Sequence, residues 1–467
     1  MKGPVATLVV AGLAAGLVSP NSKAALMAQQ LAADSAPNAV SMASLQSLKT
    51  KQRNSDRAEG LYDADRYAAQ AADKCSNGKA GEYSCRNVDL AGFIRHQDTG
   101  SGQREGNDLW ETLPGWTSST GREFGIIGQT DGTAFVEVLK DGSLQYIGRL
   151  PTQTENSVWR DMKVIGNHAY IGAEARNHGL QVFDLTKLLT LDPKNPKTFN
   201  TNSDLTAHYK DFGSSHNIVA HDSTNTISAV GTKPADGCNA GLWMLDVSDP
   251  SRPQKSGCVS EDGYVHDAQC VIYSGPHQQY RGREICFNYN EDTLTIADIT
   301  ERASPKQLSR TTYKGATYTH QGWIADEGMR YLLLDDELDE SAKTGPAADQ
   351  KTTTYIVDVS DLTKPVFTGL YKSPAKSIDH NQYVINGLSY QANYGSGLRI
   401  VDVSSVTQDP TGASFKEAGF FDVRPEDDSV GGQATFNGAW SVYPYLKSGY
   451  ILVNSIERGV FSLKYTA

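Results

Sequence analysis

The chain repeats one short pattern of apolar and polar positions. In each copy, three or four mostly apolar residues run into Asp, a further apolar residue, and Ser or Thr, as at residues 242–248 and 398–404. An apolar run of this length that ends in Asp and Ser is typical of a short β-strand followed by a tight turn. Further copies begin at Leu180, Leu294 and Tyr355, and a degenerate copy begins at Ala134. A unit that recurs along one chain predicts a repeat fold.

Each unit contains four strand-like runs. In one unit they lie at residues 216–220, 226–230, 242–247 and 253–259. The first runs of successive units begin 50 to 60 residues apart, near Trp110, Arg160, His216, His266, His320, His380 and Gly438. Seven units of four short strands predict an all-β fold, a seven-bladed β-propeller with four-stranded antiparallel blades.

The last unit is one strand short, because the chain ends at Ala467 after its third run. An unassigned strand-like run stands before the first unit, at residues 88–95, and resembles the fourth runs at 144–148 and 366–370. We therefore expect residues 88–95 to complete the last blade and close the ring. Closure would also hide sheet edges that could otherwise pair with other chains.

The N-terminal part differs from the repeats. Lys2, an uncharged apolar run at residues 5–18 and small residues at 22–24 predict a signal peptide at residues 1–24, with a short buried helix as the alternative. No later segment is apolar enough to span a bilayer. Residues 25–74 are rich in Ala, Gln, Ser, Lys and Asp, and we expect a partly helical, partly disordered arm with helices at 42–48 and 64–72. The propeller would then occupy residues 75–467.

Six cysteines allow fifteen disulfide connectivities. Their placement on either side of short turns favours three local pairs, Cys75–Cys85, Cys238–Cys258 and Cys270–Cys286, and the alternative is buried free thiols. Disulfides need an oxidising compartment, which agrees with a signal peptide. The formal net charge of −11 gives no basic surface for phosphate backbones, so nucleic acid is excluded as the expected partner.

The repeats give the chain a resemblance to a known family. With its Leu-x-Ile-Val-Asp phrases, and with matching stretches at residues 75–90, 128–135 and 159–161, the chain resembles the LVIVD-repeat proteins of the choice-of-anchor B family. The first and last units keep only a blurred form of the phrase. The resemblance implies a secreted or cell-surface propeller and no particular reaction. No anchor or sorting tail follows Lys464, so we expect a released, extracellular protein.

Four histidines occupy the same place in four successive units, at the start of the first strand. In a propeller the first strands line the central channel, so these imidazoles should gather at one mouth, where the polar ends of the second strands also return. We expect the ligand site there. The candidate residues are Arg160, Asp161, Glu174, His216, His266, Asp267, His320, Asp336, His380 and Asn393.

This arrangement leaves three interpretations open. Imidazole is a common metal ligand, so His216, His266, His320 and His380 could hold a divalent metal ion, although no cofactor is certain. A His/Asp pair could serve as acid and base, which would make the protein a secreted hydrolase or lyase. The same side chains could simply tie blades together. We favour a binding or interaction module for a protein or a small extracellular ligand, with no catalytic residue assigned.

Residues 334–340 form the densest acidic run of the chain. Carboxylates at this density can hold Ca²⁺, but the run lacks the spacing and the Gly of an EF-hand loop. We therefore expect a solvated loop here.

Overall fold

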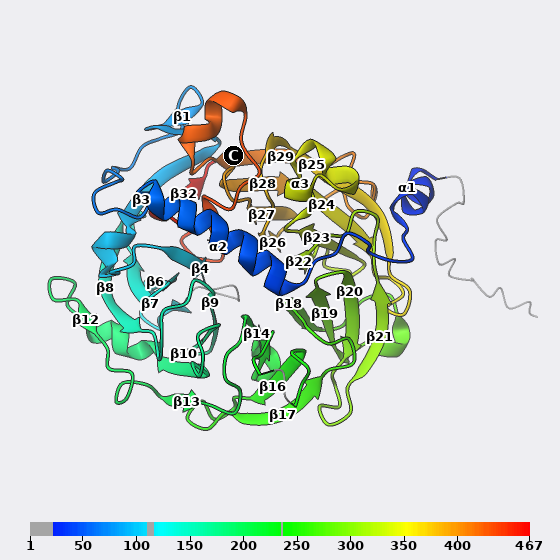
Figure 1. Ribbon diagram of the computed structural model, residues 1–467, viewed down its shortest axis with the longest axis horizontal. Helices are drawn as coiled ribbons and strands as arrows, with labels where there is room; N and C mark the ends of the chain where they lie inside the picture. Colours follow the sequence, from blue (N-terminus) through cyan, green and yellow to red (C-terminus); the bar gives the residue numbers. More distant parts are fainter. Residues whose placement is uncertain (1–21, 110–115, 235–236) are drawn as a thin grey trace, which may run out of the picture.

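The computed structural model describes residues 22–109, 116–234 and 237–467. In these residues short strands form seven twisted sheets around a central axis, and the innermost strands of neighbouring sheets contact one another (Figure 1). The predicted seven-bladed β-propeller is therefore confirmed. We number the blades in chain order, and within each blade we give the strands from the axis outward.

The first four blades are each one repeat unit. Blade 1 contains β4 (Gly106–Leu109), β6 (Glu123–Gln129), β7 (Gly132–Val138) and β8 (Leu144–Pro151), with β5 (Trp116–Thr117) and β12 (Lys197–Thr198) added to β6 and β8. Blade 2 contains β9 (Arg160–Ile165), β10 (His168–Ala173), β11 (Leu180–Asp184) and β13 (Ala207–Tyr209). Blade 3 contains β14 (Asn217–His221), β15 (Thr226–Val230), β16 (Leu242–Asp246) and β17 (Gln254–Val259). Blade 4 contains β18 (Asp267–Ile272), β19 (Glu284–Asn290), β20 (Thr293–Asp298) and β21 (Lys306–Thr311).

The remaining blades return to the N-terminus. Blade 5 contains β22 (Thr319–Ile324), β23 (Tyr331–Asp336), β24 (Lys351–Asp358) and β25 (Val366–Lys376). Blade 6 contains β26 (Asn381–Ile385), β27 (Leu388–Ala392), β28 (Leu398–Asp402) and β29 (Lys416–Phe421), extended by β2 (Tyr83–Arg86) and β1 (Lys79–Ala80). Blade 7 contains β30 (Ala439–Tyr443), β31 (Tyr450–Ser455), β32 (Gly459–Tyr465) and β3 (Val88–Arg95).

Strand β3 closes the ring, as the sequence predicts. It pairs antiparallel with β32, from Val88 opposite Tyr465 to Arg95 opposite Gly459. Six of the seven predicted first-strand starts lie within one residue of an inner strand. The seventh, near Trp110, lies outside the described residues, and the inner strand of blade 1 is described at Gly106–Leu109.

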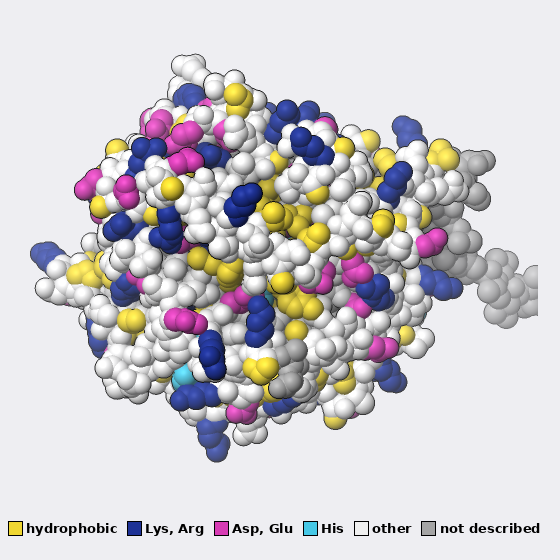
Figure 2. Space-filling model, in the orientation of Figure 1, with side chains coloured by type: hydrophobic (Ala, Val, Ile, Leu, Met, Phe, Trp, Pro, Cys, Tyr) yellow, Lys and Arg dark blue, Asp and Glu magenta, His cyan; other side chains and the backbone are white. Residues whose placement is uncertain are grey.

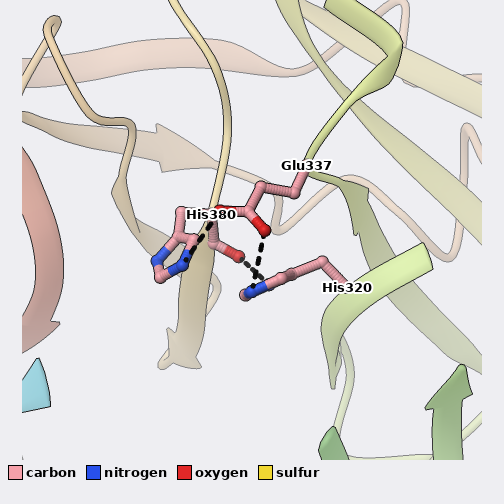
Figure 3. A group of neighbouring side chains, drawn as sticks. All are labelled: His320, Glu337 and His380. Atoms are coloured by element: carbon pink, nitrogen blue, oxygen red, sulfur yellow. Dashed lines mark hydrogen bonds and ion pairs between the residues drawn. The ribbon is translucent and has the colours of Figure 1, made fainter. Parts of the chain in front are cut away.

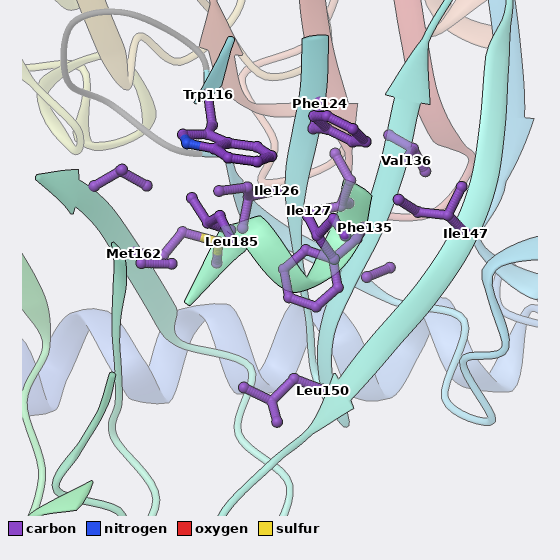
Figure 4. Close-up of a cluster of buried hydrophobic side chains, with 14 of the residues drawn as sticks. Trp116, Phe124, Ile126, Ile127, Phe135, Val136, Ile147, Leu150, Met162 and Leu185 are labelled. Carbon is purple, nitrogen blue, oxygen red and sulfur yellow. The ribbon is translucent and has the colours of Figure 1, made fainter. Parts of the chain in front are cut away.

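Apolar side chains fill the spaces between blades. One cluster lies around β6 and β7, where Phe124, Ile126, Phe135 and Val136 are almost fully buried (Figure 4). Nearly every residue of these two strands is buried, because each blade is covered by a neighbour on both faces. The strands therefore read as continuous apolar runs, which is the pattern that the repeats show.

The three predicted disulfides are present. Cys75 pairs with Cys85, Cys238 with Cys258 and Cys270 with Cys286, so none of the six cysteines is free. The second pair joins the loop before β16 to β17, the third joins β18 to β19, and the first joins the segment before β1 to β2. Each therefore restrains a local loop.

The helices differ from the prediction. Helix α1 (Lys23–Leu31) packs at the rim, and α2 (Met42–Ala58) crosses the mouth of the channel (Figure 1). Helix α2 extends ten residues beyond the expected end at residue 48. In place of the expected helix at residues 64–72, residues 64–67 form turns and bends and residues 68–72 are irregular. The other helical turns are α3 (Asp339–Ala342), η1 (His96–Thr99), η2 (Leu185–Thr190), η3 (Asp222–Thr224), η4 (Gln278–Tyr280), η5 (Gly345–Asp349) and η6 (Pro425–Val430).

The extension of α2 has a tertiary cause. Met42, Leu45, Lys49, Arg53 and Asp56 recur every three or four residues and are all buried, so one face of the helix is embedded. Three of these five are charged, which is why the apolar pattern alone ends the helix too early. The predicted signal peptide at residues 1–24 lies outside the described residues up to residue 21. In the described part of the chain, no helix has the length and apolar character needed to cross a membrane.

Candidate ligand site at the channel mouth

The structure brings the four repeated histidines together in one row. The ring centroids of His216 and His266 are 4.2 Å apart, and those of His266 and His320, and of His320 and His380, are each 4.3 Å apart. Each residue stands at or next to the first residue of an inner strand, and the inner strands surround the axis. The row therefore lies at one mouth of the channel, and all four side chains are buried.

Backbone carbonyls fix the orientation of two of these rings. Nδ1 of His320 donates to the carbonyl of His380 over 2.9 Å, and Nδ1 of His380 donates to the carbonyl of Trp440 over 2.5 Å. A carbonyl can only accept, so in the neutral rings Nε2 carries the lone pair. Burial lowers the pKa of His320 to about 4 and that of His380 well below its usual value, which keeps both rings neutral near pH 7.

Glu337 lies opposite both lone pairs. Its Oε1 is 3.4 Å from Nε2 of His380, and its Oε2 is 3.6 Å from Nε2 of His320 (Figure 3). The carboxylate is fully buried, its Oε2 has no hydrogen-bond partner, and Oε1 accepts from the hydroxyl of Tyr394 over 2.5 Å. Burial alone would raise the pKa of Glu337, but Lys49 and His320 outweigh it and hold the pKa below its usual value.

The other end of the row has different partners. Nδ1 of His216 is 2.8 Å from Oε1 of Glu174. Nδ1 of His266 is 2.8 Å from the hydroxyl of Tyr318, while its buried Nε2 has no hydrogen-bond partner. The row is therefore bounded by one carboxylate at each end.

Helix α2 seats a lysine at the Glu337 end. The ammonium group of Lys49 forms an ion pair with Oε1 of Glu337 and lies 4.7 Å from the ring centroid of Trp440, 5.6 Å from that of Phe436 and 5.7 Å from that of Tyr394. Three aromatic rings and a carboxylate form a cage that suits an ammonium ion. Lys49 is itself buried, with a side chain only 4% exposed.

The rest of α2 pairs with other carboxylates around the mouth. Gln46 donates to Glu174, and Arg53 and Arg57 each approach Glu105 to 2.6 Å. The Met42 amide donates to Glu291 over 2.6 Å. Exposed Lys and Arg side chains on this face are interspersed with Asp and Glu and form no single patch (Figure 2). The cations that contact these carboxylates include Lys49, Arg53 and Arg57 of α2, together with Lys233, which lies 3.4 Å from Glu174.

Several of the predicted site residues have structural partners instead. Arg160 donates to the carbonyl of Gln129 over 3.1 Å, and Asp161 lies 2.6 Å from the ammonium group of Lys163. Asp267 accepts from the Ala268 amide at 2.7 Å. Arg160 thus joins blade 2 to blade 1, and Asp161 joins blade 2 to blade 3 through the amide of Ile218. The hydrogen bond between Ala268 and Asp267 lies within one strand.

Asp336 and Asn393 also have structural partners. Asp336 accepts from the Tyr313 hydroxyl and from the backbone amides of Thr317 and Tyr318 at 2.7–2.8 Å, and Asn393 donates to Gln391 over 3.2 Å. The place expected for Asp336 beside the histidines is taken by its neighbour Glu337.

The acidic run at residues 334–340 is buried and not solvated. Asp335, Asp336, Glu337, Asp339 and Glu340 are each at most 2% exposed. Hydroxyl and amide donors take up part of this charge, since the Tyr355 hydroxyl donates to Asp339 over 2.7 Å and the Thr353 amide to Glu340 over 2.9 Å. Burial raises the pKa of both carboxyls well above the usual range.

A cavity of about 450 Å³ extends along the inner strand β18, from Asp267 next to His266 to Ile272 at the far end of the strand. Its lining includes Val219 of β14, Ile272 of β18 and Trp323 of β22. The histidines stand at or next to the first residues of these strands, so the cavity reaches from the level of the histidine row toward the other mouth of the channel. Among the predicted site residues, Asp267 lines this cavity.

Glu337 belongs to a polar strand end that we expected at this mouth, but it was not among the candidate residues, and neither were the residues that form the cage with it. Glu337 was within reach, because it directly follows Asp336, the last residue of β23. Lys49, Tyr394, Phe436 and Trp440 come from three distant segments, and no local pattern links them.

Comparisons with known proteins agree with the repeat. A model of the LVIVD repeat matches residues 235–260 and 347–373. No curated protein matches the chain. Among solved structures, the chain is similar to the β-propeller domain of Cps50 (Swd1) from Myceliophteria thermophila, with 10% identity and a TM-score of 0.46 over 81% of this chain and 100% of that chain. The chain is thus a carrier of LVIVD repeats, arranged as a seven-bladed β-propeller.

Proposed function

We propose that the protein is an extracellular binding module whose channel mouth accepts a basic helical segment of a partner protein. The observation that carries the proposal is the seat of Lys49, where a buried carboxylate and three aromatic rings surround one ammonium group. In the structure this seat is filled by the chain's own helix α2. A partner helix would displace α2 and take its place.

The spacing along α2 indicates what such a partner must carry. Lys49, Arg53 and Arg57 are four residues apart, so they lie on one face of the helix. That face meets carboxylates of blade 5 and of the segment before blade 1, namely Glu337 and Glu105. The mouth therefore suits an amphipathic helix with basic residues at positions i, i+4 and i+8.

An extracellular location is part of the proposal. Three disulfides persist in an oxidising environment and are rare in the cytosol. The predicted signal peptide at residues 1–24 supports the same location.

A labelled peptide tests the proposal. A fluorescent peptide of residues 41–59 should bind the full-length Lys49→Ala protein at least about tenfold more tightly than the wild type, because the wild-type helix competes from within the same chain. Fluorescence anisotropy measures both affinities. The peptide with Lys49→Ala should lose binding, whereas the peptide with Lys51→Ala should keep it, since Lys51 is exposed on α2. Equal binding of the two altered peptides would refute the proposal.

One observation favours a second candidate, acid–base catalysis at the same mouth. His216 and Glu174 are within hydrogen-bond distance at 2.8 Å, as a general base and the residue that orients it would be. Gln46 of α2 covers this pair through its bond to Glu174. Hydrolysis of chromogenic esters or glycosides by the Lys49→Ala protein, lost in Lys49→Ala/His216→Gln, would favour catalysis. No turnover above background would exclude it for these substrates.

A further inference from the structure

We infer that His320, His380 and Glu337 form a binding site for a divalent transition metal ion. Zn²⁺ serves as the probe ion for this site. When α2 lies across the mouth, the ammonium group of Lys49 forms an ion pair with the carboxylate of Glu337. The inference rests on the proposed function in one respect, namely that α2 can leave the mouth. It differs from the expected ligand set, because Glu337 joins this group and His216 and His266 are not part of it.

The first argument is the ligand set itself. One ligand atom from each of His320, Glu337 and His380 lies within 4.8 Å of the others, and all three residues are buried. Two imidazole nitrogens and one carboxylate leave a fourth position of a tetrahedral zinc ion open. Within the described residues, no other group of three His, Cys, Asp or Glu side chains meets this distance.

The second argument is the spacing between the ligand atoms. The two Nε2···Oε distances are 3.4 and 3.6 Å, which is long for a hydrogen bond. Two ligands that each lie about 2.0–2.1 Å from a tetrahedral metal ion are about 3.3–3.4 Å apart. The observed separations therefore leave room for an ion between the atoms.

The third argument is the orientation of the rings. Metal-binding histidines usually donate their other ring N–H to a carbonyl or a carboxylate, which fixes the ring and frees the ligating nitrogen. His320 and His380 both do so, through the carbonyls of His380 and Trp440. Their lone pairs then face the oxygens of Glu337, an acceptor facing an acceptor with no proton between them. A cation between these atoms would turn the unfavourable contact into a favourable one.

The fourth argument concerns charge. A buried carboxylate needs a positive partner, and Lys49 supplies it from outside the propeller. Oε2 of Glu337 is left without a hydrogen-bond partner even so. If Lys49 leaves the site, the buried negative charge of Glu337 loses its cation, and a metal ion can then bind in its place. Metal binding and the seating of α2 therefore exclude each other.

Metal binding by the full-length protein tests the inference. The Lys49→Met variant, dialysed against Zn²⁺, should hold one ion per chain and bind it at least about tenfold more tightly than the wild type, because the competing cation is gone. Adding His320→Ala, His380→Ala or Glu337→Gln to this variant should abolish the bound ion. Two control variants should leave the number of bound Zn²⁺ ions per chain unchanged. Lys51→Met alters an exposed lysine and is compared with the wild type. Lys49→Met/His168→Gln alters a histidine at the start of β10 and is compared with Lys49→Met. The inference fails if Lys49→Met binds no more Zn²⁺ than the wild type, or if the three ligand variants keep it.

A second measurement uses the wild-type protein, should Lys49→Met fail to fold. Saturating Zn²⁺ should speed hydrogen–deuterium exchange of the amides of α2 and leave α1 unchanged, because the metal displaces Lys49. If Zn²⁺ leaves the exchange of the α2 amides unchanged, the inference that metal binding and the seating of α2 exclude each other is wrong.

The two proposals can fail separately. Peptide binding without Zn²⁺ binding would refute the metal site and leave the proposed function standing. Zn²⁺ binding without peptide binding would do the reverse.

Discussion

Two neighbours fix the tautomer of His96, which is buried near the junction of blades 1 and 7. Its Nε2 donates to the carbonyl of Ser455 over 2.7 Å, and its Nδ1 accepts from the amide of Gln129 over 3.1 Å. Burial lowers the pKa of His96 to about 4, although the Ser455 carbonyl and the charges of Glu105 and Asp131 act in the opposite direction. A proton on Nδ1 would therefore have to face the N–H group of Gln129.

This arrangement predicts acid instability. The pKa of His96 is 6.5 in the unfolded chain and about 4 in the folded chain, so between these pH values only the unfolded chain binds the proton. The associated stability is fully present above pH 6.5 and is lost as the pH falls toward 4, at a cost of about 3 kcal/mol. Urea unfolding between pH 7 and pH 4 should show a shallower loss for His96→Gln than for the wild type. An unchanged slope would contradict this assignment.

At the residue scale the sequence predicts which side chains gather, but not how they pair. The shared position of His216, His266, His320 and His380 in the repeat is enough to place them at one mouth. Whether Asp336 or Glu337 reaches the histidines depends on how the chain turns after β23, where Asp336 is drawn to the backbone amides of Thr317 and Tyr318. The sequence alone does not show which backbone amides will donate to which carboxylate.

At the element scale α2 shows the same limit. Its apolar pattern ends near residue 48, yet the helix continues to Ala58 because Lys49, Arg53 and Asp56 are buried against charged and polar partners. Helix prediction assumes that the buried face is apolar. Strands such as β7 and β16 were easier to predict, because they are apolar on both faces and are bounded by turn residues.

Strand β3 supports a prediction about ring closure. A Cβ atom at Gly92 would lie 2.7 Å from the carbonyl oxygen of Gly142 and 3.0 Å from Cα of Ser143, both backbone atoms of the neighbouring blade 1. Gly92→Ala should therefore push β3 away from blade 1 and destabilise the fold by about 1–3 kcal/mol, measured by urea unfolding. The matched control is Gly102→Ala, where the nearest atom is a carboxylate oxygen 3.8 Å away. Equal stability of the two variants would show that this contact does not constrain closure.

At the scale of the whole molecule, the count of repeat units predicted the ring. Seven units, a last unit short of one strand and an unassigned strand at 88–95 could be combined in one way that pairs every strand. The same reasoning could not predict that α2 covers one mouth while a cavity of about 450 Å³ extends along the inner strands toward the other. That asymmetry depends on a segment outside the repeat.

The asymmetry makes a prediction about access to the channel. Trp440 is 6% exposed beneath α2, whereas Trp323 lines the cavity that extends toward the opposite mouth. Acrylamide quenches only indole rings that it can contact. The Trp323→Phe variant should therefore lose fluorescence that acrylamide quenches readily, and the Trp440→Phe variant should lose fluorescence that acrylamide quenches poorly. Lys49→Ala should raise the quenching of the Trp440 component and leave that of Trp323 unchanged, because removing Lys49 leaves Glu337 unpaired and loosens the helix. If both components respond equally, the two mouths are not independent, and α2 does not act as a local cover.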